Sequence, residues 1–396
     1  MKKFLKSSIA LAVILLAVSS VSAEIRIKEQ ARIRTSAYSV SKTEGGDKKA
    51  VLWNLKNASA TDYLNFYADN EYAGVAIESA INAGLKNGAD AITFDTYYGW
   101  LNYGALKFTF GDYDSRFTNR YNVTATEAGL LDSDIAKYGL SNKISYGLTA
   151  DKTGKTWLYD FGNVAQSAGG ENLSLIADYT LSDIADGKLL LKAGLLESEY
   201  DKGTEFEQNA GYVFEAAWQG KSASLDLIFK NPVNKAFGGA AYLTYKPSDA
   251  FAAVAGFTAG VETDVIDLAF AVDGRLQYAF SKDLKATAVA KYSSYKADGA
   301  DDAESALEAG AELSYAASDR LVFALDARLD LTDLDDNEGK DLGENTVTVS
   351  PRVKISAGPL AAITAAVEFT QALNSGDNDA AVKTKVDVPV IFRVKL

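Results

Sequence analysis

The final residues, 386–396, read V-D-V-P-V-I-F-R-V-K-L. Successive side chains along a β-strand point to opposite faces, so residues of one parity share a face. The apolar face of this segment consists of Val386, Val388, Val390, Phe392, Val394 and Leu396. The opposite face carries the charges Asp387, Arg393 and Lys395. The segment predicts an amphipathic strand with one face for lipid or a core and one for water. Pro389 has no N–H to donate to a ladder, which predicts a bulge in this strand.

The N-terminal segment has the pattern of a secretory signal peptide. Three Lys residues precede an apolar run over residues 9–18, and small residues end at Ala23. The run is shorter than the ~20 residues of a spanning helix, which favours cleavage after Ala23, with residues 1–23 removed, over a membrane anchor. Beyond residue 24 the longest stretch without Asp, Glu, Lys or Arg covers 355–367 and is also too short. Any membrane residence of residues 24–396 is therefore expected to use strands.

The composition excludes most enzyme chemistries. The chain has no Cys and no His, which excludes disulfides, imidazole bases, Ser-His or Cys-His nucleophile pairs and the usual zinc sites. We therefore predict no enzymatic activity, no catalytic residues, no cofactor and no metal site. The net charge of −13 argues against a nucleic-acid partner, which would require a basic face. The 21 Tyr, 18 Phe and 31 Gly beside 5 Pro fit a protein of many alternating strands.

An alternating pattern recurs from about residue 171 onward, with runs of roughly ten residues separated by turns. The clearest run has on one parity Ile266, Leu268, Phe270, Val272, Leu276, Tyr278 and Phe280, and on the other Asp267, Asp273, Arg275 and Gln277. The next run places Lys285 and Lys291 opposite an apolar face. Similar runs place Arg328 and Arg352 on a charged face. These faces are expected to meet water.

Short and long connections alternate between the runs. Tight turns are predicted near residues 69–71, 102–104, 181–187, 220–221, 247–249, 281–283, 317–319 and 358–359. Longer polar stretches are predicted at 41–61, 82–90, 112–170, 198–209, 231–237, 296–305, 333–344 and 372–380, with a brief one near 263. This division is typical of a closed transmembrane antiparallel β-barrel with short periplasmic turns and long external loops. We predict an all-β barrel of about 18 strands, with 16 as the alternative, and both termini on the short-turn side.

A soluble β-sandwich or a β-solenoid would show the same alternation. The strand count, the terminal strand and the secretion signal favour the membrane barrel. Aromatic residues near the short turns predict an interfacial girdle, namely Trp218, Tyr245, Phe251, Tyr278, Phe280, Tyr315, Phe323 and Phe392.

Two local motifs resemble bacterial outer-membrane proteins. The terminal strand resembles the closing strand of outer-membrane barrels, which implies an assembly signal at Val390, Phe392, Val394 and Leu396. Residues 105–114, A-L-K-F-T-F-G-D-Y-D, lead into an unusually long connection at 112–170 and resemble the strand before the third external loop of the general diffusion porins. The Pro-Glu-Phe-Gly-Gly signature of those porins is absent.

The porin resemblance implies a loop that folds into the barrel and narrows it. The charges that would then enter the lumen are Asp112, Asp114, Arg116, Arg120, Asp132 and Asp134. They would face the basic wall residues Arg275, Lys291, Arg328 and Arg352, which gives a transverse field for orienting polar solutes. An exposed adhesive loop is the alternative.

The sequence therefore predicts a porin in the bacterial outer membrane, which passes small hydrophilic solutes and ions by passive diffusion. Its expected partners are outer-membrane lipid, the outer-membrane assembly machinery and further copies in a homotrimer. A major surface protein, in which the barrel only anchors ligand-binding loops, is the alternative function. A substrate-selective channel would need a line of aromatics on the inward parity, which the sequence does not predict. Loss of three Lys with the signal changes the net charge from −13 to −16, which predicts mild cation selectivity at low salt.

Overall fold

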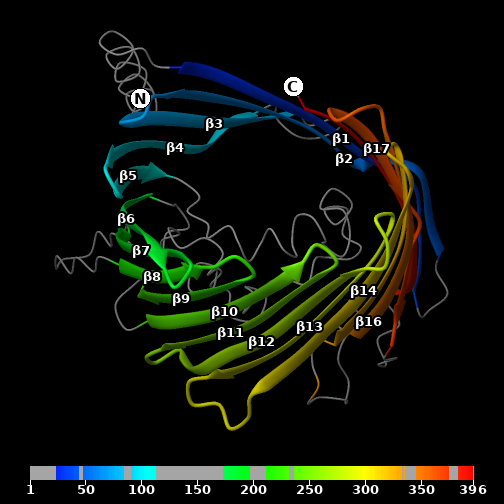
Figure 1. Cartoon of the computed structure of the whole chain (residues 1–396). Helices are drawn as coiled ribbons and strands as arrows, with labels where there is room; N and C mark the ends of the chain where they lie inside the picture. Colours follow the sequence, from blue (N-terminus) through cyan, green and yellow to red (C-terminus); the bar gives the residue numbers. More distant parts are fainter. Residues whose placement is uncertain are drawn as a thin grey trace, which may run out of the picture.

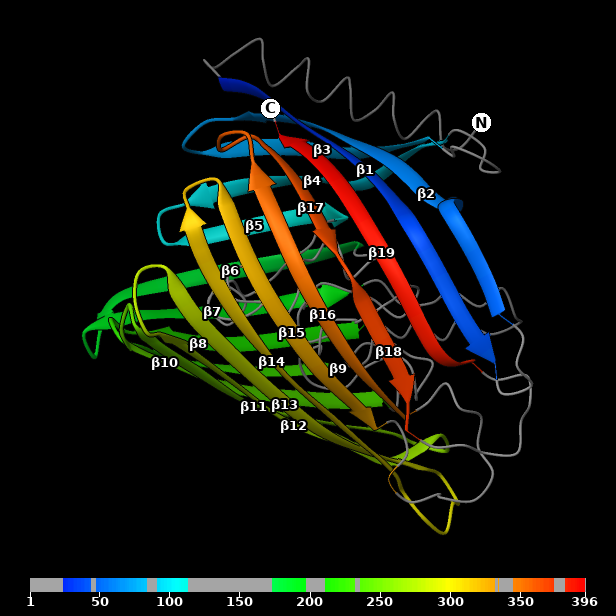
Figure 2. The same cartoon turned by 90° about the vertical axis from the view of Figure 1, so that its right-hand side faces the viewer.

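The computed structural model describes residues 24–43, 48–83, 91–112, 173–196, 211–231, 236–331, 334, 345–373 and 382–395. These residues form one antiparallel sheet of 19 strands that curves into a barrel (Figures 1 and 2). No helix among them is long and apolar enough to cross a membrane. The strands are β1 (Glu24–Thr43), β2 (Lys48–Asp69), β3 (Ala73–Ala83), β4 (Ala91–Tyr103), β5 (Leu106–Asp112), β6 (Leu173–Ile184), β7 (Gly187–Leu196), β8 (Gly211–Gln219), β9 (Ala223–Asn231), β10 (Ala236–Ser248), β11 (Phe251–Glu262), β12 (Ile266–Ala279), β13 (Leu284–Ala297), β14 (Glu304–Ser318), β15 (Leu321–Leu331), β16 (Asn345–Ser356), β17 (Ala361–Ala366), β18 (Glu368–Ala372) and β19 (Val382–Lys395).

The sheet closes on itself because β1 pairs with both β2 and β19. Strands β17 and β18 both pair with β16 and with β19, so they occupy one position around the barrel. The interruption between them is at Val367, whose N–H donates to the carbonyl of Pro351 at 3.0 Å. Pro351 has no N–H to return that bond, which explains the break. The nineteen elements therefore fill eighteen positions, which confirms the predicted strand number.

The bulge predicted from Pro389 lies in the partner strand. Pro389 of β19 pairs with Ser36 of β1, and the register shifts between Ser36 and Tyr38. A proline inside a ladder removes one donor, and an extra residue on the opposite strand absorbs the mismatch.

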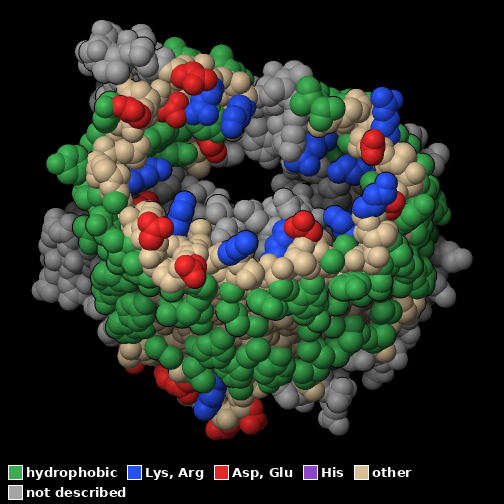
Figure 3. All heavy atoms as spheres, viewed as in Figure 1, with side chains coloured by type: hydrophobic (Ala, Val, Ile, Leu, Met, Phe, Trp, Pro, Cys, Tyr) green, Lys and Arg blue, Asp and Glu red, His purple; other side chains and the backbone are tan. Residues whose placement is uncertain are grey.

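The two faces of the strands differ in exposure as the alternation predicts. On β9, Leu225, Leu227 and Phe229 point outward and are 40, 47 and 41% exposed, whereas Asp226 and Lys230 point inward and are 2 and 0% exposed. Apolar side chains cover the outside of the barrel across the lower part of the view in Figure 3, and we call this outer surface the apolar belt. A barrel with this belt presents lipid with an apolar surface and keeps its charges inside.

Short turns lie at one end of the barrel, where the described chain also begins and ends (Figure 2). The aromatic residues predicted for a girdle gather near these turns. Tyr245 and Phe251 contact each other with ring centroids 6.5 Å apart, and Tyr278 meets Phe280 edge-on at 5.0 Å. The Trp218 indole N–H donates to the carbonyl of Ile184 at 2.9 Å.

Two local predictions were wrong. The stretch 41–61, predicted as a polar loop, is mostly strand, because β1 continues to Thr43 and β2 begins at Lys48. Ile266, predicted on the outer face, is only 2% exposed and belongs to the buried inner cluster. The cause is a register shift between Ile266 and Leu268, since one inserted residue reverses the face of everything before it.

Candidate functional site

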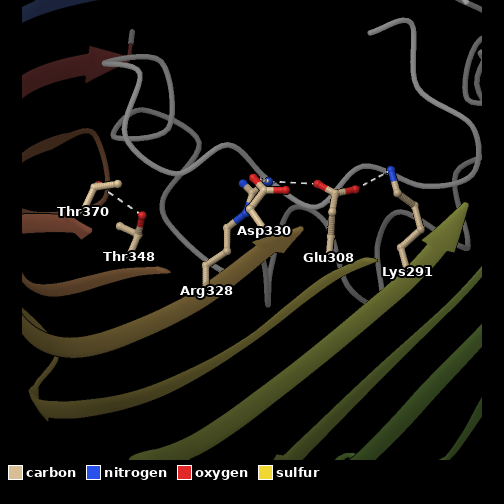
Figure 4. Close-up of polar contacts among 6 residues, drawn as sticks. All are labelled: Lys291, Glu308, Arg328, Asp330, Thr348 and Thr370. Atoms are coloured by element: carbon tan, nitrogen blue, oxygen red, sulfur yellow. Dashed lines mark hydrogen bonds and ion pairs between the residues drawn. The ribbon is translucent and has the colours of Figure 1, made fainter. Parts of the chain in front are cut away.

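The inner wall of β13 to β15 carries a chain of ion pairs (Figure 4). Glu308 accepts from two cations on either side of it: Lys291 Nζ lies 2.5 Å from its Oε2, and Arg328 Nη2 lies 2.8 Å from its Oε1. The same Arg328 nitrogen contacts Asp330 Oδ2 at 2.8 Å. Farther around the wall, the hydroxyls of Thr348 and Thr370 are 3.1 Å apart. The ion pairs thus link β13, β14 and β15, and the hydroxyl contact links β16 to β18.

Two further groups of ion pairs on the inner wall also place a cation next to a carboxylate. Arg352 lies 2.8 Å from Glu312 and 3.5 Å from Asp326, and Lys192 lies 3.0 Å from Glu215. Charges with so little exposure are tolerated only when partners replace the water that they lose. We call the wall of β13 to β16, with its ion pairs, the charged arc.

The four predicted wall residues all face the lumen. Arg275, Lys291 and Arg328 are 4, 2 and 8% exposed, and Arg352 is half-buried. Their surroundings differ from the predicted basic wall, because Lys291, Arg328 and Arg352 each contact a carboxylate of the wall itself. Sequence parity placed these cations on the correct face, but only strand register could show that Glu308 and Glu312 lie beside them.

The predicted constriction segment is described only where it leaves the barrel. Asp112 is the last residue of β5 and is half-buried. Gly111 before it has φ +129, and a Cβ there would lie 2.4 Å from the carbonyl oxygen of Tyr97, so this position requires glycine. The other predicted charges lie outside the described residues, namely Asp114, Arg116, Arg120, Asp132 and Asp134. Residues 1–23 and Leu396 also lie outside them.

In the terminal strand, the predicted assembly residues Val390, Phe392 and Val394 share the outer face. Phe392 is 42% exposed, whereas the inward Asp387 and Ile391 are 2 and 1% exposed. The amphipathic strand predicted from residues 386–396 is therefore present with the expected orientation.

A second region of the inner wall is uncharged between its ends. Apart from Lys246 and Glu262 near the strand ends, the inward residues of β10 and β11, with two of β12, are neutral and mostly small, and we call these neutral residues the neutral arc: Ala236, Gly238, Ala240, Tyr242, Thr244, Ala252, Val254, Gly256, Thr258, Gly260, Ala269 and Ala271. They continue into a buried apolar cluster with Ile176, Val213 and Ile228. Gly256 makes room for the Tyr242 ring, because a Cβ there would lie 2.5 Å from Tyr242 Cε1. The alternating runs singled out in the sequence all carry charges on one parity, and the neutral arc was not predicted.

A group of aromatic residues that the sequence did not predict also faces the lumen near the short turns. Trp100 packs over Gly74, where a Cβ would lie 2.1 Å from the indole Cζ2, and its ring centroid is 5.7 Å from that of Tyr98. Lys107 Nζ lies 5.5 Å from the Trp100 ring centroid. Tyr67 donates its hydroxyl proton to Glu78 at 2.7 Å. Strands before residue 105 alternate less regularly, which hid this group.

Comparison with known proteins identifies the fold. No protein-family model and no curated protein matches the sequence. Among solved structures, the chain is similar to Pseudomonas aeruginosa OccK2 in complex with glucuronate, with a TM-score of 0.54 and 8% identity over 94% of this chain and 98% of that one. It is also similar to Acinetobacter baumannii OccAB3, with a TM-score of 0.53 and 9% identity over 94 and 100% of the two chains. Salmonella typhi OmpF in complex with daunomycin gives a TM-score of 0.51 and 12% identity over 94 and 98%.

The chain therefore has the fold of the bacterial outer-membrane porins, a transmembrane antiparallel β-barrel. This confirms the fold class predicted from the sequence.

Proposed function

We propose that the protein is a porin: a water-filled channel of the bacterial outer membrane for passive diffusion of small hydrophilic solutes and ions. The observation that carries this proposal is the reversal of faces in a closed barrel, with apolar side chains outside and ion pairs inside. A barrel of this strand number encloses a lumen too wide for wall side chains alone to fill. Diffusion through it requires orientation of solutes but no catalysis.

The same proposal covers how the protein reaches the membrane. Residues 1–23 are removed as a signal peptide, and Val390, Phe392, Val394 and Leu396 are read by the outer-membrane assembly machinery. The support is the outward, lipid-facing position of Phe392 at the end of the chain. Outer-membrane lipid then surrounds the apolar belt, and the barrels associate as a homotrimer.

We further propose that the connection from Asp112 to β6 folds into the lumen and narrows it. Support comes from the neutral arc: Ala236, Thr258 and Ala269 face the inside of a hollow barrel, yet each is 0% exposed. If this part of the wall were in contact only with water, these side chains would be exposed to solvent. The connection is long enough to cover it, and Ile176, near the start of β6, belongs to the same buried cluster. Arg275, Lys291, Arg328 and Arg352 would face the narrowed passage from the wall.

Single-channel recording in planar bilayers tests this function. Purified protein should produce stepwise current increases of uniform size. Deleting residues 118–142 should enlarge each step, because it removes material from the lumen. A matched deletion of residues 336–342 in the connection between β15 and β16 serves as the control and should leave the step size nearly unchanged. Absence of steps from folded protein would overturn the channel, and binding of the folded protein to cell surfaces would then favour the anchored adhesin.

A further inference from the structure

The lumen opening at the short-turn end is bordered by Lys and Arg side chains (Figure 3). We call six of these the mouth ring, because each occupies an inward position near a short turn or a chain end: Arg26, Lys28, Lys107, Lys285, Lys354 and Arg393. They come from β1, β5, β13, β16 and β19 and so surround the opening. Their positive charges therefore add at its centre.

Four cations of the mouth ring differ from the charged arc in exposure. Lys28, Lys107 and Lys285 are exposed, and the Arg26 side chain is 42% exposed, whereas Lys291 of the charged arc is 2% exposed. Lys28 and Lys107 lie over aromatic rings, at 5.2 Å from the Tyr67 centroid and 5.5 Å from the Trp100 centroid. A neutral ring holds an ammonium group without cancelling its charge.

Acidic side chains lie beside part of the mouth ring. Asp69 contacts Arg26 at 2.6 Å, Asp178 is the ladder partner of Lys107, and Glu24 begins β1. Asp178 is shared with Lys192, whose Nζ lies 3.9 Å away. Glu308 of the charged arc is likewise shared, between Lys291 and Arg328, so the two regions differ in exposure.

We propose that this mouth binds multivalent anions of the condensed-phosphate kind that approach from the short-turn side. A ring of like charge attracts an anion in proportion to the anion's own charge, so a multivalent anion gains several times the attraction of a monovalent one. A single exposed ion pair contributes little to binding, so monovalent anions would not be retained. This inference rests on the proposed function only in taking the lumen to be filled with water.

Inorganic tripolyphosphate is a suitable probe, and its binding to the full chain in detergent can be followed by calorimetry and by broadening of its phosphorus resonances. The ring variant combines Lys28→Gln, Lys107→Gln and Lys285→Gln. The control variant combines Lys221→Gln, Lys282→Gln and Arg320→Gln, which removes the same charge from exposed turns at the same end of the barrel. At about 0.1 M salt, where charges are screened beyond about 10 Å, the ring variant should bind roughly tenfold more weakly and the control should change little.

Two further measurements separate the effect of charge from an effect on folding. The variant with Arg at the three ring positions should retain binding, which separates charge from folding, and heat-modifiable migration in gels checks that each variant is folded. Equal losses in the ring and control variants, or affinity for tripolyphosphate no greater than for monophosphate, would overturn the site. Because binding is measured without ion flow, a protein that binds but does not conduct would contradict the proposed function and leave this inference intact.

Discussion

The neutral arc and the charged arc occupy neighbouring parts of the same barrel, yet only their inner faces differ. Outside, Leu243 of β10 and Leu325 of β15 are 51 and 49% exposed and belong to one apolar belt. Inside, β10 and β11 present Ala, Gly, Thr, Val and Tyr, whereas β13 to β16 present Lys, Arg, Asp and Glu in contact with one another. Lipid therefore requires an apolar outer face from every strand, whereas the residues on the inner face can differ from strand to strand.

The arcs also depend on different kinds of interaction. The neutral arc depends on packing, as Gly256 beneath Tyr242 illustrates. The charged arc depends on mutual compensation, because each buried cation has given up water. Mutations should therefore act on the two arcs by different mechanisms.

The largest effect is expected from Glu308→Gln in the charged arc. The change leaves Lys291 and Arg328 next to each other without the carboxylate that they share, and it should destabilise the barrel by about 3 kcal/mol. Urea unfolding in lipid vesicles measures this, with Asp319→Asn in the exposed turn after β14 as the control. Reversal potentials of the variant should move toward anions at low salt. A variant as stable as the control would show that the pairs contribute nothing.

A smaller loss of stability, equal for the strands of both arcs, is expected when a charge is placed on their outer face. Leu243→Lys and Leu325→Lys each place a charge in the apolar belt and should each cost about 2 kcal/mol, since Lys costs about 2–4 kcal/mol at the bilayer midplane and less toward the interface. Leu243 lies five residues, and Leu325 four residues, from the short-turn end of its strand, so their depths in the membrane are similar. A clear difference between the two variants would mean that the arcs differ outside as well as inside.

An added methyl group should destabilise the neutral arc where the neighbouring side chains leave no room for it. Gly256→Ala would place a methyl group 2.5 Å from Tyr242 Cε1, and we expect a loss of about 1–2 kcal/mol. Gly274→Ala on the outer face of β12 meets nothing closer than 3.9 Å and should be neutral or slightly stabilising. In a Tyr242→Ala background, Gly256→Ala should cost less, because only the contact with Asp273 Oδ2, at 2.7 Å, then remains. Persistence of that penalty would locate the strain elsewhere.

The smallest effect is expected at the edge of the charged arc, where Thr348 and Thr370 form an uncharged contact of 3.1 Å. Thr348→Val keeps the shape of the side chain and removes the hydroxyl, so it should cost about 1 kcal/mol. A double-mutant cycle with Thr370→Val measures the pairwise energy by the same unfolding assay. A coupling energy near zero would show that water replaces the lost partner.

Particular strands show how far the sequence could predict this protein. The alternation of residues 386–396 correctly predicted an amphipathic strand. Parity also gave the inward positions of the four wall cations, because a period of two fixes the face of every side chain once one is known: Arg275, Lys291, Arg328 and Arg352. The same rule failed at Ile266, where a bulge inserted one residue, and in strands before residue 105, where the lumen-facing Trp100 and Tyr98 were missed.

The sequence by itself determined the outer surface, because lipid demands the same apolar alternation from every strand and that demand is local. Only the tertiary structure decided what the inner surface does. Strand register and closure of the sheet decide which side chains meet inside the barrel. They place Lys291 beside Glu308 and Arg352 beside Glu312, and they bring Lys28 and Lys285 to the same opening. Register is set by turns, bulges and closure of the whole sheet, so no single segment contains it.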